Sequence, residues 1–416
     1  MPRRMKDSGL QWVGKIPAEW EVKRGKYFLR LLARPTREED GVITCFRDGE
    51  VTLRTNRREE GFTISLKECG YQGVEPGDLV VHGMDGFAGS IGISDSRGKA
   101  SPVLNVLDAD ANKRFVMYFL RGLAYRDVFS ALSTGIRVRS CDLRWKKLAD
   151  LSYLLPPLPE QEAIAAFLDS VTGKIDELRG KLKREIDRLE DYKKSAITKA
   201  VCHGLDPKAK MKDSGVAWCP KVPEGWDARR VGLTMVERTA RSASGKEEPL
   251  SMSQKLGIVP SKEIEVANPA SSYVGAKLVC VGDLVLNKLK AHLGVFAISK
   301  YDGLVSPDYS VYRVNQTTSK EYLNFLFHTP SCISEFRRRI TGVAVGFNRL
   351  YTSELFKVKI PFPPLPAQRE IAAHIDTMVG RVNAIIEKRK RQLDALDKLK
   401  RTVVYDYVTG KREVPR

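Results

Sequence analysis

The strongest constraint on this chain is that it contains the same unit twice. The pentapeptide MKDSG at residues 5–9 returns at residues 211–215, and PPLP at residues 156–159 returns at residues 363–366. The first pair is 206 residues apart and the second pair 207. An offset that changes so little predicts two copies of one fold. Two similar units on one polypeptide have approximate twofold symmetry, which is also the symmetry of duplex DNA.

Each copy divides into an irregular part and a helical part. Short β-branched and aromatic runs between glycines predict mixed α/β domains at residues 1–155 and 205–362. The segments 156–204 and 363–416 have helical periodicity, and their prolines fix where each helix starts, because proline is tolerated in a first turn but not further inside. The fold class that we predict is therefore α+β, with two similar mixed α/β domains in tandem, each followed by a long α-helix.

Apolar residues recur along both helical segments at alternating spacings of four and three. This heptad pattern is typical of helices that pack on each other along a seam, the line of apolar contact of a coiled coil. The predicted seam residues are Ile164, Leu168, Val171, Ile175, Leu178 and Leu182 in the first segment and Ile371, Ile375, Met378, Val382, Leu396 and Leu399 in the second.

The net charge favours a polyanionic partner. Lys and Arg total 70 against 51 Asp and Glu, which gives +19 at pH 7. Membrane attraction would also suit this charge, but no apolar stretch of about 18 residues is present, and the first residues lack the apolar run of a signal peptide. The seven cysteines stand far apart and include no Cys-x-x-Cys pair, which indicates reduced thiols. We expect a cytoplasmic protein.

Two motifs connect these features to a known family. Trp-x-x-x-x-Pro-x-x-Trp occurs at residues 12–20 and again at 218–226, and both helices begin with Pro-Pro-Leu-Pro-x-Gln-x-x-Ile-Ala. With the duplication and the order of parts, the whole chain resembles the specificity subunit of a type I restriction–modification system. The resemblance implies that each α/β domain is a target recognition domain that reads one half of a bipartite DNA sequence. It also implies that the two helices pair antiparallel, set the spacing between half-sites and dock two modification subunits.

The resemblance implies that this chain is not an enzyme and binds no cofactor. S-adenosylmethionine would be held by the modification (methyltransferase) subunits, and ATP and Mg by the restriction subunits. The sequence agrees, because it has no Gly-x-x-x-x-Gly-Lys-Ser/Thr phosphate loop, and its five histidines lack the spacing of a metal pair. Two other functions remain open on the residues alone. They are a self-contained DNA methyltransferase or nuclease, and a coiled-coil scaffold that binds nucleic acid through charge only.

Candidate DNA-binding residues are polar or cationic side chains on Gly- or Ser-flanked segments. Arg and Asn are favoured because they make bidentate contacts to guanine and adenine, whereas Lys more often contacts phosphate. For any one of them, an ordinary solvated surface residue is an equally good interpretation. The first domain offers Thr134, Arg137, Arg139, Arg54, Asn56, Arg57 and Arg58, and the second offers Asn287, Lys288, Lys290, His292, Arg337, Arg338, Arg339, Thr341, Asn348 and Arg349.

Overall fold

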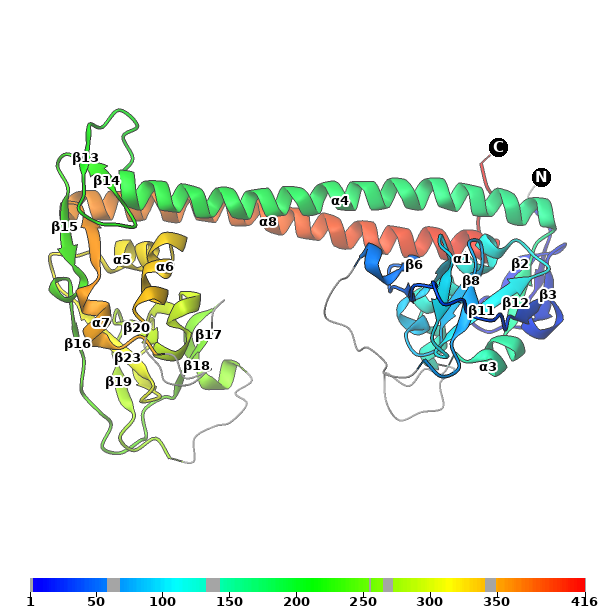
Figure 1. Cartoon of the computed structure of the whole chain (residues 1–416), viewed down its shortest axis with the longest axis horizontal. Coiled ribbons are helices and arrows are strands. Elements are labelled where there is room, and N and C mark those ends of the chain that lie inside the picture. Colours follow the sequence, from blue (N-terminus) through cyan, green and yellow to red (C-terminus); the bar gives the residue numbers. More distant parts are fainter. Residues whose placement is uncertain are drawn as a thin grey trace. The chain divides into compact units, whose positions relative to one another are not determined.

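The computed structural model describes residues 3–57, 68–131, 143–253, 256–264, 272–340 and 349–415. It forms two compact units: unit 1 comprises Met1–Lys183 with Lys390–Arg416, and unit 2 comprises Arg184–Arg389. Each unit contains one α/β domain together with parts of both long helices, α4 (Leu158–His203) and α8 (Leu365–Val408). The predicted fold class, two mixed α/β domains each followed by a long helix, is confirmed (Figure 1).

The centre of each α/β domain is an antiparallel four-stranded sheet. In unit 1 its order is β4 (Leu29–Leu31), β11 (Leu104–Ala109), β8 (Leu79–His82) and β9 (Ile91–Ile93). In unit 2 the order is β16 (Met235–Glu237), β23 (Tyr309–Val314), β20 (Leu284–Asn287) and β21 (Phe296–Ile298). The registers agree, because His82 lies opposite Leu104 just as Asn287 lies opposite Tyr309. The two domains therefore share a fold at the level of single residues.

Smaller elements surround each sheet in the same order. Unit 1 adds β1 (Met5–Asp7), β2 (Lys15–Pro17), β3 (Glu21–Arg24), β5 (Ile43–Cys45), β6 (Val51–Leu53), β7 (Gln72–Val74), β10 (Gly98–Ala100), β12 (Ser152–Leu155), α1 (Lys113–Tyr125), α2 (Val128–Ala131) and α3 (Trp145–Asp150). Unit 2 adds β13 (Met211–Asp213), β14 (Lys221–Pro223), β15 (Asp227–Arg230), β17 (Leu250–Ser253), β18 (Gly257–Pro260), β19 (Lys277–Val279), β22 (Gly303–Val305), β24 (Lys359–Phe362), α5 (Lys320–Phe327), α6 (Pro330–Arg338) and α7 (Thr352–Lys357).

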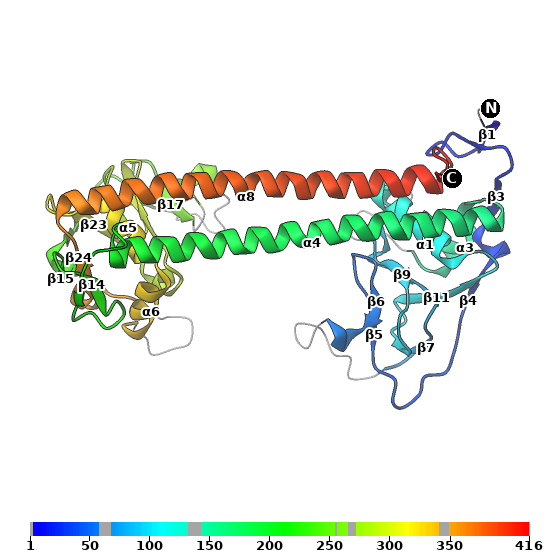
Figure 2. The same ribbon diagram turned by 90° about the horizontal axis from the view of Figure 1, so that it is seen from above.

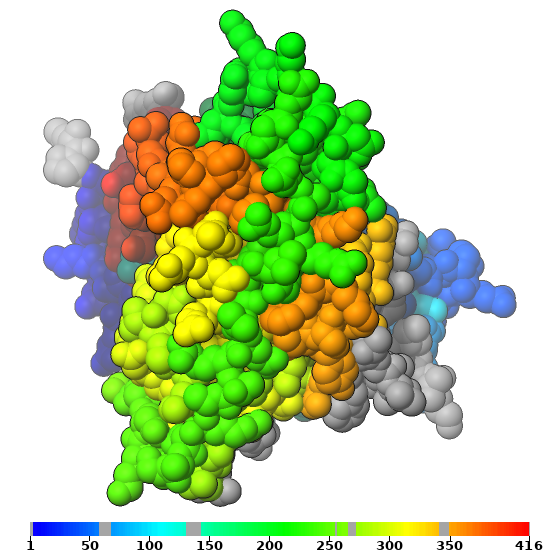
Figure 3. Space-filling view, turned by 90° about the vertical axis from the view of Figure 1, so that its left-hand side faces the viewer, coloured from blue at the N-terminus to red at the C-terminus, as the bar shows by residue number. Residues whose placement is uncertain are grey.

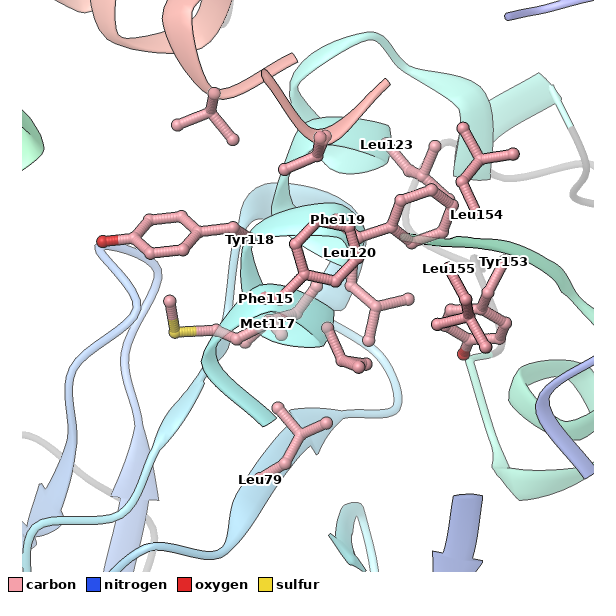
Figure 4. Packing of buried hydrophobic residues seen from close by; sticks show 14 of the residues in the cluster. Leu79, Phe115, Met117, Tyr118, Phe119, Leu120, Leu123, Tyr153, Leu154 and Leu155 are labelled. Atoms are coloured by element: carbon pink, nitrogen blue, oxygen red, sulfur yellow. The ribbon is translucent and has the colours of Figure 1, made fainter. Parts of the chain in front are cut away.

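The sheet of unit 1 is buried on both faces. Leu79 and Val81 of β8 belong to a core with α1, whereas Val80 between them belongs to a second core with β5 and β6, because successive strand residues point to opposite faces. Figure 4 shows the α1 side, where Phe119 lies near Tyr153 of β12 with ring centroids 5.3 Å apart. Burying an aromatic side chain of this size stabilises the fold by about 1.5–3 kcal/mol.

Within each unit the two long helices lie side by side and run antiparallel (Figures 1 and 2). In unit 1 the Arg179 guanidinium lies 2.7 Å from the carboxylate of Asp397, and the rings of Phe167 and Tyr407 are 4.5 Å apart. In unit 2 a different pair, Arg389 and Glu185, joins the two helices at 2.8 Å. Each α/β domain therefore contacts the start of one helix and the end of the other.

Two of the twelve predicted seam residues are exposed rather than buried. Leu178 and Leu399, both predicted in the seam, are exposed, whereas Ile386 of α8 is buried, and Thr172 of α4 is buried against the hydroxyl of Tyr118 of α1. A straight helix has 3.6 residues per turn, so its buried face drifts by about 20° in each heptad relative to a 3.5-residue repeat. The other predicted seam residues are buried or half-buried, namely Ile164, Leu168, Val171, Ile175, Leu182, Ile371, Ile375, Met378, Val382 and Leu396.

The glutamine of each Pro-Pro-Leu-Pro-x-Gln motif joins a long helix to its domain. Gln161 accepts a hydrogen bond from the amide of Asn112, at the start of α1, and donates one to the carbonyl of Pro156. Gln368 does the same in unit 2, with the amide of Ser319 at 2.8 Å and the carbonyl of Pro363 at 2.8 Å. Both glutamines are buried, so each satisfies two backbone groups that water does not reach.

Gln368→Ala should destabilise unit 2 by about 1–3 kcal/mol, because it leaves a buried N–H and a buried carbonyl without partners. Gln161→Ala should do the same in unit 1. Chemical denaturation of the full chain measures the effect, with the exposed Glu370→Ala on the same helix as control. An unchanged stability for Gln368→Ala would show that other groups satisfy this backbone.

Candidate nucleic-acid interface

One end of each four-stranded sheet carries a capped turn at the same position. After β8, the Nδ1 atom of His82 accepts hydrogen bonds from the amides of Met84 at 3.2 Å and Asp85 at 3.0 Å. After β20, the Oδ1 atom of Asn287 accepts from the amides of Leu289 and Lys290. Two different side chains therefore hold one backbone turn. In the first domain the imidazole must be neutral at Nδ1 to do so.

The candidate cations of unit 2 gather around this turn. The Lys288 ammonium donates to the carbonyl of Pro307 at 3.2 Å, and Arg349 pairs with Asp308 at 3.0 Å. The amide of Leu350 bonds to the Lys288 carbonyl, which brings Arg349 beside Lys288. Burial lowers the pKa of Lys288, and Lys277 and Arg349 nearby lower it further. A phosphate would relieve this cation repulsion.

The predicted Arg337–Arg339 run does not act as one group. The Arg337 guanidinium donates to the carbonyl of His292 and joins the cluster at the turn. Arg339 instead pairs with Glu335 at 2.8 Å, and Arg338 is mostly exposed. Arg337 and Arg339 thus have different partners, and Arg338 also lies 3.8 Å from Glu335. Asn287 is buried and its oxygen is used as a cap, whereas Lys290 is exposed.

Three candidate residues of unit 1 lie among the described residues, and all three contact other side chains of the domain. Arg57 pairs with Asp48 at 2.9 Å and Glu50 at 2.8 Å, and its guanidinium lies over the ring of Phe46. Asn56 donates to Thr52 and Arg54 to Thr44. Since two carboxylates neutralise Arg57, its charge is less available for DNA than the sequence indicates. Arg58, Thr134, Arg137, Arg139, Thr341 and Asn348 lie outside the described residues.

Sequence reasoning missed His82, which occupies the place of the candidate Asn287. The signal was available, because VVH at residues 80–82 aligns with VLN at 285–287 under the duplication. In the part of the chain that the structure describes, no three His, Cys, Asp or Glu side chains are grouped as metal ligands. No helix among those residues is long and apolar enough to cross a membrane.

The two caps should respond differently to pH. Burial lowers the pKa of His82 below its ordinary 6.5, so the neutral form stabilises the turn above about pH 6.5, and this stability is lost as pH falls through the folded pKa. His82→Asn should remove that pH dependence and keep the cap, whereas His82→Ala should cost about 1 kcal/mol at pH 8. Hydrogen–deuterium exchange of residues 79–90 between pH 5 and 8 measures both. Equal protection at all pH values in the unsubstituted chain would contradict the assignment.

Comparisons with known proteins agree with the sequence and the fold. The family profile described as the type I restriction modification DNA specificity domain matches residues 260–395. The putative type I restriction enzyme MjaX specificity subunit of Methanocaldococcus jannaschii is 24% identical, over 97% of this chain and 96% of that protein. The EcoKI specificity subunit of Escherichia coli K12 is 20% identical, over 94% and 89%.

Solved structures show the same fold. A chain from a structure described as the basis of complex assembly and conformational transition of the type I R-M system has a TM-score of 0.69 at 16% identity, over 95% of this chain and 99% of that one. The HsdS subunit of Thermoanaerobacter tengcongensis has a TM-score of 0.50, over 95% and 98%. The matched domain, relatives that align over nearly their full length and the shared fold, together with the duplication and both motifs, support the identification of the chain as a type I restriction–modification specificity subunit.

Proposed function

We propose that this chain recognises a bipartite DNA sequence, with each α/β domain reading one half. The observation that carries this proposal is the capped turn at the same end of both sheets, which is built alike but bears different side chains. His82 stands in one domain where Asn287, followed by Lys288, stands in the other. A shared scaffold with divergent loops is how related domains bind different sequences in one geometry.

The chain acts in this proposal without catalysis of its own. The groups around the turn of unit 2 are cations and amides, which suit contacts to phosphates and base edges rather than bond cleavage. Methyl transfer falls to two modification subunits that hold S-adenosylmethionine, and translocation and cleavage to restriction subunits that use ATP and Mg. The long helices set the distance between half-sites. Their continuity over 46 and 44 residues supports this role.

Repeated apolar side chains on the helices support the docking of two copies of one partner. Leu178 and Leu399 in unit 1 are 48% and 50% exposed, and Ile385 and Tyr192 in unit 2 are 42% and 57% exposed. Leu178 and Ile385 are 207 residues apart, as are Tyr192 and Leu399, so they are equivalent positions of the duplication. We name Leu178 with Leu399 in unit 1, and Ile385 with Tyr192 in unit 2, the two helix patches. Exposed apolar side chains at equivalent places suit two equal partner surfaces.

Single-molecule sequencing of genomic DNA tests the DNA-recognition proposal directly. Cells with this chain and its modification subunit should carry methylated adenines in one bipartite motif that is absent without the chain. Exchanging residues 205–362 for another such domain should change one half-site only. Seven residues inserted into each helix, between Leu178 and Leu189 and between Glu387 and Lys398, should change only the spacer. A methylated motif that is the same with and without the chain would refute the proposal.

Charged substitutions in the helix patches should reduce the number of bound modification subunits one at a time. Leu178→Asp should leave one modification subunit bound, and the double variant with Ile385→Asp should leave none, because each change affects a different unit. Native mass spectrometry counts the subunits. Lys183→Asp, which lies about 140° further around α4 than Leu178, serves as the control. Two bound subunits on the double variant, with unchanged helix content by circular dichroism, would exclude the patches as docking sites.

A further inference from the structure

A charged cavity of about 650 Å³ lies in unit 2, at the end of the sheet away from the candidate DNA-binding turn. Four cations line it, Arg238, Arg313, Lys320 and Arg369, against two carboxylates, Asp283 and Glu321. Asn287 and Tyr309 are at the turn end of β20 and β23, whereas Leu284 and Tyr312, next to the cavity, are at the other. Figure 3 shows this side of unit 2, where the yellow segment that includes 313–321 adjoins the orange start of α8.

The two carboxylates of the cavity are already occupied. Asp283 is buried, accepts two hydrogen bonds from Arg238 at 2.7 and 3.1 Å, and also accepts one from the amide of Cys280. Glu321 accepts from the hydroxyl of Ser319, the residue that caps α5. Arg313, Lys320 and Arg369 form no ion pair with any residue that the structure describes. The cavity therefore has an excess of two positive charges and no internal anion to balance it.

In the first domain an ion pair neutralises the charge at the position equivalent to Arg313. Asp108 of β11 occupies the place of Arg313 in β23 and lies opposite Arg30 in the strand register. Arg30 pairs with Asp108 at 2.9 Å and with Asp110 at 2.6 Å. The hydrogen bond from Arg30, with smaller contributions from the Ala109 amide and Lys113, lowers the pKa of Asp108 to about 2. In unit 2 the residue opposite Arg313 is Val236. The duplication has thus replaced an internal ion pair with an unpaired cation.

A buried hydroxyl without a partner adds an independent observation. Thr318 lines the cavity and is only 7% exposed, and its Oγ1 atom has no hydrogen-bond partner. Buried polar groups in proteins are almost always hydrogen-bonded, so an orphan of this kind indicates a missing partner. Thr318 stands directly before the capping residue of α5, where the helix dipole also favours an anion. Hydroxyl, guanidinium and ammonium groups together are the ligands of a phosphate.

We propose that this cavity, formed by Arg238, Arg313, Thr318, Lys320 and Arg369, binds the phosphate of a small phosphate monoester. A dianion matches the excess of two positive charges, and the volume lies within the range of about 300–1,000 Å³ that is usual for small-molecule sites. The site lies across the sheet from the candidate base-reading turn, so its ligand is a molecule other than the target DNA. The charge excess is independent of the proposed reading of half-sites, whereas the choice of a ligand other than DNA rests on that proposed function.

Isothermal titration of the full chain with inorganic phosphate and with adenosine monophosphate, at constant ionic strength, tests the proposal. We expect saturable binding of one phosphate group per chain and an affinity at least tenfold lower in Arg313→Asp, which installs the residue of the first domain. Thr318→Val keeps the shape of the side chain, removes the hydroxyl and should also weaken binding. Lys113→Ala, at the equivalent of Lys320 in unit 1, should bind as the unsubstituted chain does.

Two results would overturn the proposal. The first is that phosphate and adenosine monophosphate do not bind the unsubstituted chain, or bind it and Arg313→Asp with equal affinity, while circular dichroism shows that both chains are folded. The other is an effect of Arg313→Asp on duplex DNA alone. In that case neither small probe would bind. The slope of log affinity against log salt concentration, measured with DNA that lacks the target, would decrease in magnitude by about one phosphate contact. That result would assign the cavity to the DNA backbone.

Discussion

The rest of the structure depends on how the end of each long helix sits against a Pro–Trp pair. Gly410 follows the last turn of α8, and a Cβ atom there would overlap Pro17 and lie 3.2 Å from Trp20. Gly204 follows α4, and a Cβ atom there would lie 3.2 Å from Trp226 and 3.6 Å from Pro223. Both glycines have positive φ, which other residues rarely adopt. The first α/β domain is thus covalently continuous with the start of α4 and packed against the end of α8, whereas the second is continuous with both the end of α4 and the start of α8. This explains the tryptophan motif as a structural anchor rather than a base-stacking site.

This contact gives each domain two fixed points. The start of one helix is joined by the buried glutamine of the proline motif, and the end of the other is joined through the tryptophan and core residues such as Val404 and Tyr407 in unit 1. A hinge at one helix end would leave a domain free to rotate, whereas two attachments oppose rotation. A domain positioned in this way can present its loops in a defined orientation, which sequence readout requires.

Comparison of the two copies distinguishes side chains that stabilise the fold from side chains that contact a ligand. Positions that keep their role in both copies, such as Gln161 and Gln368, satisfy backbone groups that no solvent reaches. Positions that change their chemistry lie at the two ends of the sheet. At one end of the sheet, His82 of the first domain is replaced in the second by Asn287, which Lys288 follows. At the other end, Asp108 is replaced by Arg313. A substitution that changes the charge of a side chain and keeps the backbone alters which ligand binds without destabilising the fold.

The sequence by itself determined the duplication, the two α/β domains, the starts of the helices and the resemblance to a family, because repeats and prolines act locally along the chain. Only the tertiary structure decided which positions of the long helices are buried, because Leu178 remains 48% exposed whereas Tyr118 of α1 covers Thr172. It also decided that carboxylates neutralise Arg57 and that Arg337 and Arg339 have different partners. The reason is that the charge a side chain leaves available depends on neighbours that are distant in sequence. The role of each motif glutamine likewise required the backbone that it bonds, which comes from a helix 49 residues away.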